Sequence, residues 1–215
     1  MSTTFYIVRH GQSVANDLGI FLGQVDMDLT ETGRKQAQIT ADYFKNQGIK
    51  PHAIYASDLS RAYNTARATA ALWEMPIHTD VRLREINAGA WEGVPFEELP
   101  KRFPRTYTTW LQDIGNAKCD GGETAEDVQN RFIAALTDIA HANKDRTIFI
   151  FTHATPIRVF AAHCMGKTLG DVKNIPWASN ASVTKAVFQD DIFQLIEYGI
   201  NDFMGKFVTK LPANV

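Results

Sequence analysis

The segment Phe5-Tyr6-Ile7-Val8 is apolar along its whole length and is followed directly by Arg9-His10-Gly11. Such a run is typical of a strand that is buried on both faces of a parallel sheet. Thr147-Ile148-Phe149-Ile150-Phe151 has the same form and is followed by Thr152 and His153. The shorter run Ala53-Ile54-Tyr55-Ala56 is also rich in residues that favour strands. We therefore expect these runs to be neighbouring strands at the centre of one sheet.

Segments with helical spacing of apolar residues lie between and around these strands. Apolar positions recur every three or four residues over 30–47, 59–73 and 124–141. Thr155-Pro156 is typical of an N-cap and first helical residue, and predicts a short helix that runs to about Met165. Strands that alternate with helices predict an α/β protein, a three-layer α/β/α sandwich with a mostly parallel sheet.

Two parts of the chain depart from this alternation. Segments 181–188 and 193–198 flank Gln189-Asp190-Asp191 and predict a hairpin, which would be the antiparallel C-terminal portion of the sheet. Segment 89–122 contains several prolines and aromatic residues, and we expect short helices that form a small cap insertion beside the sheet. No linker or repeat interrupts the chain, so residues 1–215 are expected to form a single domain with the cap at about 89–122.

Composition and charge exclude several classes of function. The chain has 215 residues, of which 45% are hydrophobic and 21% charged, which is ordinary for a globular protein. The formal net charge is −2, so no overall positive field is available to bind nucleic acid or an anionic membrane. The N-terminus lacks the pattern of a signal peptide, and Cys119 and Cys164 are the only cysteines. We expect a cytoplasmic protein; its oligomeric state cannot be deduced from the sequence.

Polar residues follow each of the three expected strands. Arg9 and His10 follow the first, Arg61 lies at the start of the helix after the second, and His153 follows the third. In open α/β sheets, ligands bind outside the carboxyl ends of the strands. Two cationic guanidinium groups and two imidazoles at this edge, together with helix N-termini, predict an anion site that contains a candidate nucleophile.

Taken singly, each of these residues has an ordinary structural explanation. A histidine at a strand end is more often a satisfied polar residue than a catalyst, and an arginine in a first helical turn is more often a surface charge. Their shared position favours a functional site. A metal site would require a carboxylate or cysteine at short spacing, as in HExxH, and no such pattern is present. We therefore expect no metal.

The order of motifs resembles the histidine phosphatase superfamily, the phosphoglycerate-mutase-like proteins. Arg9-His10-Gly11-Gln12-Ser13 resembles the family's RHG signature, and Ser57-Asp58-Leu59-Ser60-Arg61-Ala62 its S-x-L-x-R-A turn. Leu83-Arg84-Glu85, followed by Trp91-Glu92-Gly93, resembles the segment that carries the acid, and Gly121-Gly122-Glu123-Thr124 is similar to an element of the phosphatase branches. The resemblance extends from about Thr4 to Arg158 and keeps the same order along the chain.

This resemblance implies a mechanism and a set of site residues. It implies hydrolysis of a small-molecule phosphomonoester through a phosphohistidine on His10, with Glu85 as proton donor and no cofactor. Arg9, Arg61 and His153 are expected to bind the phosphoryl oxygens and to complete the catalytic set. The expected substrate-binding residues are Asn16, Gly23, Gln24 and Ala154.

Two alternatives remain open from the sequence. The protein could be a phosphoglycerate-type mutase, although the interval from Glu85 to His153 is short compared with the glycolytic mutases of the family. It could also be a non-catalytic protein that binds a phospho-ligand on the same fold. One departure from the family pattern is Ala154, which stands where members usually have glycine after the second histidine. If that position needs a positive φ, alanine would cost about 1 kcal/mol.

Overall fold

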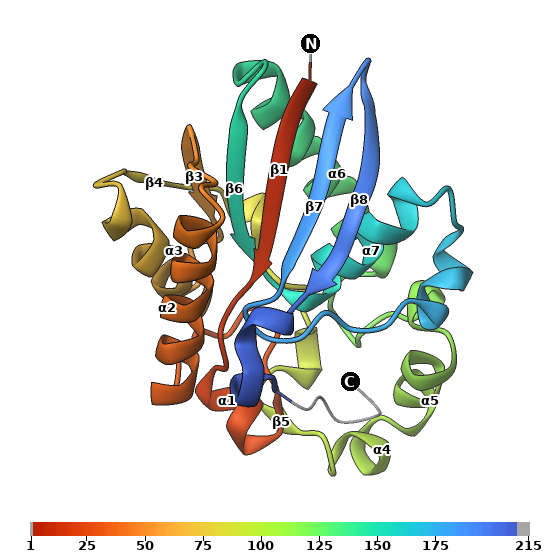
Figure 1. Cartoon of the computed structure of the whole chain (residues 1–215). Coiled ribbons are helices and arrows are strands. Elements are labelled where there is room, and N and C mark those ends of the chain that lie inside the picture. The colour runs from red at the N-terminus through yellow and green to blue at the C-terminus, as the bar shows by residue number, and fades with distance from the viewer. Residues whose placement is uncertain (1, 210–215) are drawn as a thin grey trace.

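A six-stranded mixed sheet forms the centre of the molecule in the computed structural model, which describes residues 2–209 (Figure 1). The strand order is β4-β3-β6-β1-β7-β8. The first four strands run parallel to one another, whereas β7 and β8 are antiparallel to their neighbours. The strands of this sheet are β1 (Ser2–Arg9), β3 (Ala53–Ala56), β4 (Ile77–Thr79), β6 (Thr147–Thr152), β7 (Val183–Gln189) and β8 (Ile192–Ile200).

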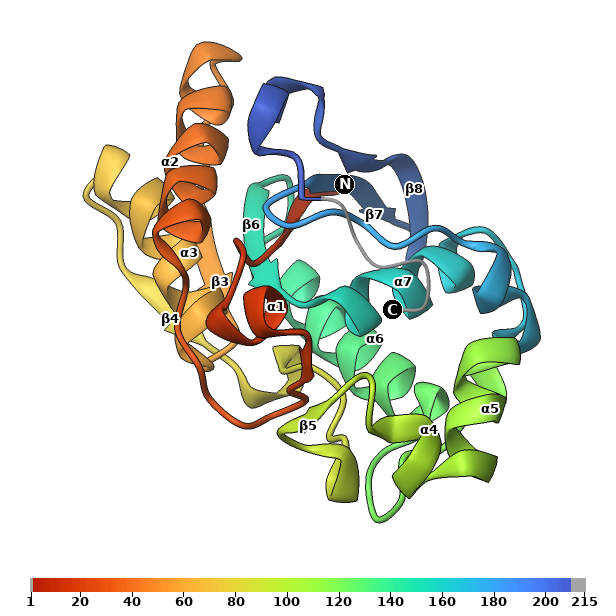
Figure 2. The same cartoon turned by 90° about the horizontal axis from the view of Figure 1, so that it is seen from below.

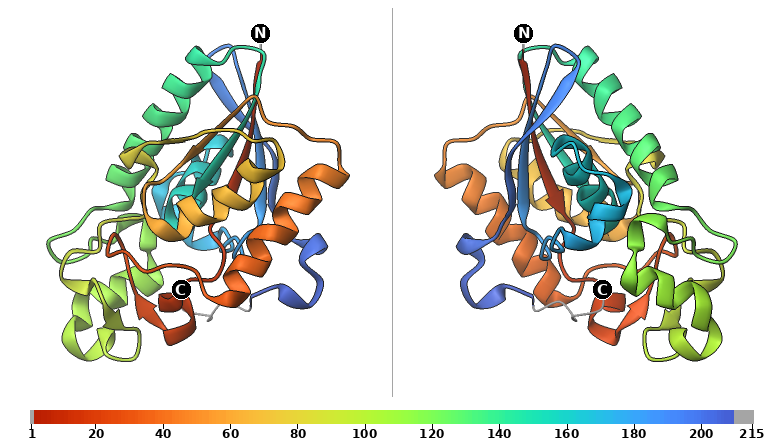
Figure 3. Two further views of the ribbon diagram at one scale, coloured as in Figure 1. Left: turned by 90° about the vertical axis from the view of Figure 1, so that its left-hand side faces the viewer. Right: turned by 90° about the vertical axis from the view of Figure 1, so that its right-hand side faces the viewer.

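Helices cover both faces of this sheet, as the edge-on views in Figure 3 show. Helices α2 (Glu31–Asn46) and α3 (Ser60–Leu72) lie on one face, and α6 (Ala125–Ala142) and α7 (Ala154–Cys164) lie on the other. The three-layer α/β/α arrangement, the mostly parallel sheet and the C-terminal hairpin expected from the sequence are therefore confirmed.

The alternating side chains of β1 explain why both faces are covered. Phe5 and Ile7 pack with α6 and α7, whereas Tyr6 and Val8 pack with α2 and α3. Strand β6 divides its side chains in the same way. Because both faces of these strands are buried, burial of apolar surface holds the two helical layers on the sheet.

Segment 89–122 lies beside the carboxyl ends of the parallel strands (Figure 2). Its aromatic residues share one buried cluster with Val128 of α6 and Val159 of α7. It includes β5 (Val94–Pro95), α4 (Leu99–Arg102) and α5 (Pro104–Gln112), together with the 3₁₀ turns Gly89–Trp91 and Ile114–Asn116. Short helices beside the sheet agree with the sequence-based expectation for this segment.

The structure also contains elements that the sequence patterns did not indicate. These are short, and most lie near the carboxyl edge of the sheet, where they are held by turns and caps rather than by long apolar stripes. They comprise α1 (Val14–Leu18), β2 (Ile20–Phe21), which pairs with β5, strand β4, and the 3₁₀ turns Val81–Leu83, Leu169–Asn174 and Asp202–Phe207.

The N-terminus of α7 differs from the expectation. His153 is the N-cap, with an extended backbone at φ −128° and ψ 178°, and the helix begins at Ala154. The expected N-cap, Thr155, is therefore the second helical residue and Pro156 the third. Proline is tolerated there because the first turn of a helix has no partners for its N–H groups. This earlier start leaves the N–H groups of Ala154 and Thr155 free to bind an acidic side chain.

Close backbone contact fixes the loop that follows β1. Gly11 lies against Gly33 of α2, where an added Cβ at Gly11 would lie 2.4 Å from the carbonyl oxygen of Gly33. A Cβ on Gly33 would lie 2.0 Å from the carbonyl oxygen of Gln12. Only glycine allows this approach, so the glycine of the Arg9-His10-Gly11 motif packs the loop against α2.

Within residues 2–209, no helix has the length and apolar character needed to cross a lipid bilayer.

Candidate active site

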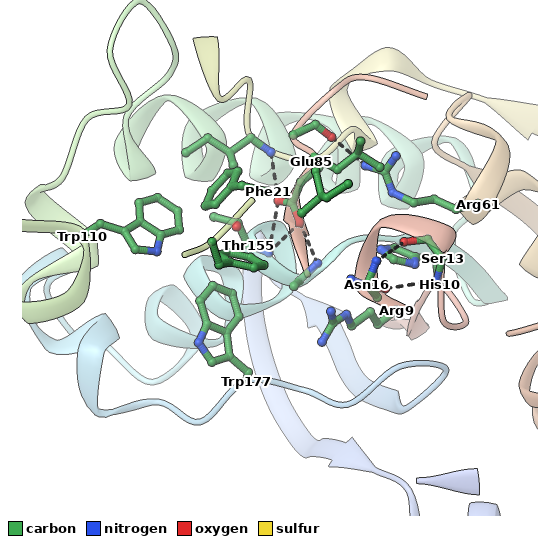
Figure 4. A pocket seen from close by; sticks show the side chains of 16 residues that line it. Arg9, His10, Ser13, Asn16, Phe21, Arg61, Glu85, Trp110, Thr155 and Trp177 are labelled. Carbon is green, nitrogen blue, oxygen red and sulfur yellow. Dashed lines mark hydrogen bonds between the residues drawn. The ribbon is translucent and has the colours of Figure 1, made fainter. Parts of the chain in front are cut away.

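A cavity opens at the carboxyl edge of the sheet, between the sheet and segment 89–122 (Figure 4). The space inside it is about 510 Å³ when the open solvent at its mouth is included. Polar residues line one end, and apolar residues from β2, segment 89–122 and the loop before β7 line the other. The lining residues are Arg9, His10, Ser13, Asn16, Ile20, Phe21, Leu22, Gly23, Arg61, Glu85, Ile86, Phe96, Trp110, Ala154, Thr155 and Trp177.

Two arginines bring positive charge to the polar end. Arg9 and Arg61 are 3% and 2% exposed, and each donates only to backbone carbonyl oxygens. Arg9 donates to Ala178 at 2.6 Å, and Arg61 donates to Gly23 at 2.6 Å and Val25 at 3.1 Å. Neither forms an ion pair within the described part of the chain, and burial lowers the pKa of both to about 10. Buried, unpaired guanidinium groups favour binding of an anion.

The hydrogen bond of His10 determines which of its nitrogens is available. Nδ1 of His10 lies 2.7 Å from the carbonyl oxygen of Gly11. A carbonyl oxygen can only accept, so Nδ1 carries the proton and Nε2 keeps its lone pair. Burial, followed by the charges of Arg61 and Arg9, holds the pKa of His10 well below its usual value of 6.5. The ring is therefore neutral, as a nucleophilic imidazole must be.

His153 lies beside His10 but is not among the residues that line the cavity. It is fully buried, and its ring centroid is 5.1 Å from that of His10. Burial, with the nearby charge of Arg61, also holds the pKa of His153 well below its usual value. Neither ring nitrogen has a hydrogen-bond partner among residues 2–209. Because buried polar groups are normally paired, a ligand oxygen is the natural partner for one of these nitrogens.

Backbone N–H groups hold the carboxylate of Glu85 at the N-terminus of α7. Ala154 N–H donates to Oε2 at 3.1 Å, Thr155 N–H to Oε1 at 3.2 Å, and Ile86 N–H to Oε1 at 2.9 Å. Ala154 does not have a positive φ. The strain that the sequence suggested for an alanine after the second histidine is therefore absent, and its amide is used instead to orient Glu85.

Arg131 holds the backbone of the segment that carries Glu85. Its guanidinium donates to the carbonyl oxygens of Arg82, Arg84 and Glu85, at 2.6 to 2.8 Å. It is oriented by a two-bond ion pair with Glu123, at 2.8 and 3.0 Å. Glu123 belongs to the Gly-Gly-Glu-Thr element found in the sequence, so this element acts by fixing the position of Glu85.

The remaining substrate-binding candidates occupy different positions. Asn16 lines the cavity, and its Oδ1 accepts from Ser13 N–H and from Asn180 Nδ2, each at 3.1 Å. The Nδ2 donor of Asn16 is therefore left available to a ligand. Gly23 lines the cavity with φ +56°, and a Cβ there would lie 2.1 Å from Oε1 of Glu92. Gln24 lies outside the cavity wall, where its Nε2 donates to the Glu85 carbonyl at 3.1 Å.

Sequence reasoning missed several residues of the site. Asn180 is fully buried, donates to both the His10 carbonyl and Asn16, and stands just before β7. Trp177 precedes it in the same loop and forms part of the cavity wall. Because β7 is antiparallel to β1, its first residues lie at the same edge as the last residues of β1. The predicted hairpin was therefore a signal that could have placed this loop at the site.

No metal site accompanies these residues. Among residues 2–209, no group of three His, Cys, Asp or Glu side chains is arranged to hold a metal ion.

Comparisons with known proteins agree with one another. The family model described as histidine phosphatase superfamily (branch 1) matches residues 5–201. Phosphoserine phosphatase 1 of Hydrogenobacter thermophilus is 27% identical over 94% of both chains, and the glucosyl-3-phosphoglycerate phosphatase of Mycolicibacterium vanbaalenii is 32% identical over 84% of both. The solved structure of YhfR from Bacillus stearothermophilus superimposes with a TM-score of 0.89, with 29% identity over 94% of this chain and 99% of its own.

The neutral state of the two histidines leads to a testable prediction. Since burial and the two arginines depress the pKa of His10 and His153, we expect their imidazole NMR signals to remain those of neutral rings between pH 8 and about pH 5.5. The signals are assigned by comparison with His10→Gln and His153→Gln. A titration of either ring with a midpoint near pH 6.5 would contradict this electrostatic account of the site.

Proposed function

The chain belongs to branch 1 of the histidine phosphatase superfamily and hydrolyses phosphomonoesters, and we propose that His10 is the residue that carries the phosphoryl group. The observation that supports this most directly is that a neutral His10, with Nε2 free, lies beside two buried arginines that form no ion pair within residues 2–209. This arrangement provides a nucleophile and positive charge for the phosphoryl oxygens at the same end of the cavity.

In the first step, Nε2 of His10 forms a bond to phosphorus as the bond from phosphorus to the leaving oxygen breaks. Glu85, in its acid form, gives a proton to that oxygen, and the alcohol departs. Arg9 and Arg61 bind the equatorial phosphoryl oxygens, and His153 and the amide of Asn16 donate to them. General acid–base catalysis contributes a rate acceleration of only roughly 10² to 10⁴. The fixed positive charge on the phosphoryl oxygens supplies further stabilisation of the transition state.

In the second step, a water molecule forms a bond to phosphorus as the bond to Nε2 of His10 breaks. The Glu85 carboxylate accepts the proton of the water, which restores its acid form. Phosphate and neutral His10 are then regenerated. The hydrogen bonds from Ala154, Thr155 and Ile86 support this role because they hold the carboxylate at the cavity wall as an acceptor.

The substrate in this proposal is a small-molecule phosphomonoester, and no metal or other cofactor takes part. Nucleic acid is not a partner in this proposal, because the net charge is −2. We place the enzyme in the cytoplasm, since both cysteines are unpaired and Cys119 is buried. We further propose that the chain is one domain in which 89–122 is a cap, supported by the apolar cluster that joins this segment to α6 and α7.

Replacement of the nucleophile tests the assignment of His10. We expect wild-type protein to release phosphate from 4-nitrophenyl phosphate in the presence of EDTA, and His10→Ala to lose at least about 10³-fold in kcat. His163→Ala, at an exposed position late in α7, is the matched control and should retain full activity. Activity near the wild-type level in a folded His10→Ala protein, or complete loss in EDTA, would overturn the proposal.

The leaving group tests the assignment of Glu85. Protonation matters most when the leaving alcohol is a weak acid, so Glu85→Gln should lower kcat/KM for an alkyl phosphate by about 10² to 10⁴. The same change should have a much smaller effect on 4-nitrophenyl phosphate, whose leaving group needs no proton. Glu98→Gln, at an exposed position of the cap, serves as control. Equal losses on both substrates would contradict the role of Glu85 as proton donor.

A further inference from the structure

The cavity has two ends of different chemistry, and only one of them is explained by phosphate. In Figure 4, Arg9, His10 and Arg61 lie together at one end, and Phe21, Trp110 and Trp177 lie at the other. The leaving group of a phosphomonoester held by the arginines must occupy the second end. The residues at that end therefore indicate the chemical nature of the leaving group.

The second end is apolar and largely aromatic. Its walls consist of side chains from β2, from the segment around Glu85, from the cap and from the loop before β7, namely Ile20, Phe21, Leu22, Ile86, Phe96, Trp110 and Trp177. Among the described residues that line the cavity, the charged groups are Arg9, Arg61 and Glu85 alone, and all three serve the phosphoryl end. A carboxylate on the leaving group would therefore lose hydration against this wall, where none of the lining side chains is cationic and Arg158 lies behind the Trp177 ring.

Trp177 is held in place from several directions. The guanidinium carbon of Arg158 lies 4.2 Å from the centroid of the Trp177 ring. Arg158 also donates to the carbonyl oxygen of Ile175 at 2.7 Å, and the Tyr198 hydroxyl donates to that of Pro176 at 2.7 Å. On the other side, Arg9 donates to Ala178. The backbone on both sides of Trp177 is thus fixed, and the phosphate-binding Arg9 is one of the groups that fix it.

The cap side of this wall is equally well packed. The Phe21 ring lies 5.2 Å from Trp110 and 5.6 Å from Phe96, measured between centroids, in edge-on contacts. Trp110 in turn contacts the fully buried Trp91 at 5.8 Å. Rigid aromatic surfaces on two sides favour a flat ligand. Their side chains are already ordered before binding, and a flat ligand excludes water from its contact with the rings.

From this arrangement we propose that the enzyme selects phosphomonoesters of flat, apolar alcohols without a carboxylate, and that Trp177 is the residue that determines this specificity. The proposal rests on the proposed function, since it places the phosphoryl group on Arg9 and Arg61. The proposed substrates differ from those in the names of two relatives, phosphoserine and glucosyl-3-phosphoglycerate. Both of those compounds carry a carboxylate close to the phosphoester.

The test uses three primary alkyl phosphates, so that their leaving alcohols are chemically similar. These are 2-phenylethyl phosphate, ethyl phosphate and O-phosphoserine, and kcat/KM is measured for each with the wild-type protein. Burial of a phenyl group should favour 2-phenylethyl phosphate over ethyl phosphate by about 10- to 100-fold. Phosphoserine should be a poorer substrate than ethyl phosphate, because its carboxylate enters the apolar end.

Variants of Trp177 assign the preference to this residue. Trp177→Ala should reduce kcat/KM for 2-phenylethyl phosphate by about 10-fold or more, while that for ethyl phosphate changes less than about 3-fold. Trp177→Phe should retain most of the preference. Trp73→Ala, a tryptophan at the end of α3 and outside the cavity, is the matched control and should leave the ratio unchanged. Retained turnover of ethyl phosphate also shows that Trp177→Ala is folded.

The results of these measurements show whether the specificity proposal fails alone or together with the proposed phosphatase function. Preference of the wild-type enzyme for phosphoserine over 2-phenylethyl phosphate would overturn the specificity and leave the phosphatase assignment intact. Equal losses on both apolar esters in Trp177→Ala would show that Trp177 only supports the fold, which also overturns its role. If none of the three esters released phosphate in a manner that depends on His10, the proposed function itself would fail, and the specificity with it.

Discussion

Two guanidinium groups are buried at one edge of the sheet and form no direct ion pair among residues 2–209, and this constraint explains the polar end of the cavity. Arg9 and Arg61 have only backbone carbonyls as partners among the described residues. The nearby charge of Glu85 offsets part of the cost of burying them, and the apolar core of the fold supplies the rest. Burial, followed by the charges of Arg61 and Arg9, lowers the pKa of His10 and keeps its ring neutral, and the two guanidinium groups give this end of the cavity a positive potential. The two charges that are costly to bury are thus the ones that we propose bind the phosphoryl oxygens.

The sheet topology explains how residues from distant parts of the sequence reach this edge. Strands β1 and β6 are parallel neighbours, so Arg9 and His10 lie beside His153. Helix α7 begins immediately after β6 and directs its first N–H groups at Glu85, as a helix N-terminus does with any anionic group. Arg131, aligned by Glu123, holds the chain that carries Glu85. The carboxylate and the positive groups are therefore positioned by backbone geometry rather than by one another.

Much of this arrangement could be predicted from the sequence, because the central strands are buried on both faces and are apolar without interruption. The rule that ligands bind at the carboxyl ends of parallel strands then placed Arg9, His10, Arg61 and His153 together. Glu85 could not be found in this way, since it follows a short 3₁₀ turn rather than a strand, and only the family resemblance indicated it. The N-cap at His153 was missed because its extended backbone, rather than a capping side chain, begins the helix.

Asn180 and Trp177 were missed for a different reason: their loop precedes an antiparallel strand, and the start of such a strand lies at the edge where the parallel strands end.

The account as a whole rests on a covalent bond between phosphorus and Nε2 of His10. The most direct test is rapid quenching of the enzyme with substrate under alkaline conditions, followed by mass spectrometry of the peptides. We expect a base-stable, acid-labile phosphoryl adduct on His10 that is absent from His10→Ala. A phosphoryl group found on His153 or any other residue, or turnover with no adduct at His10, would contradict the account.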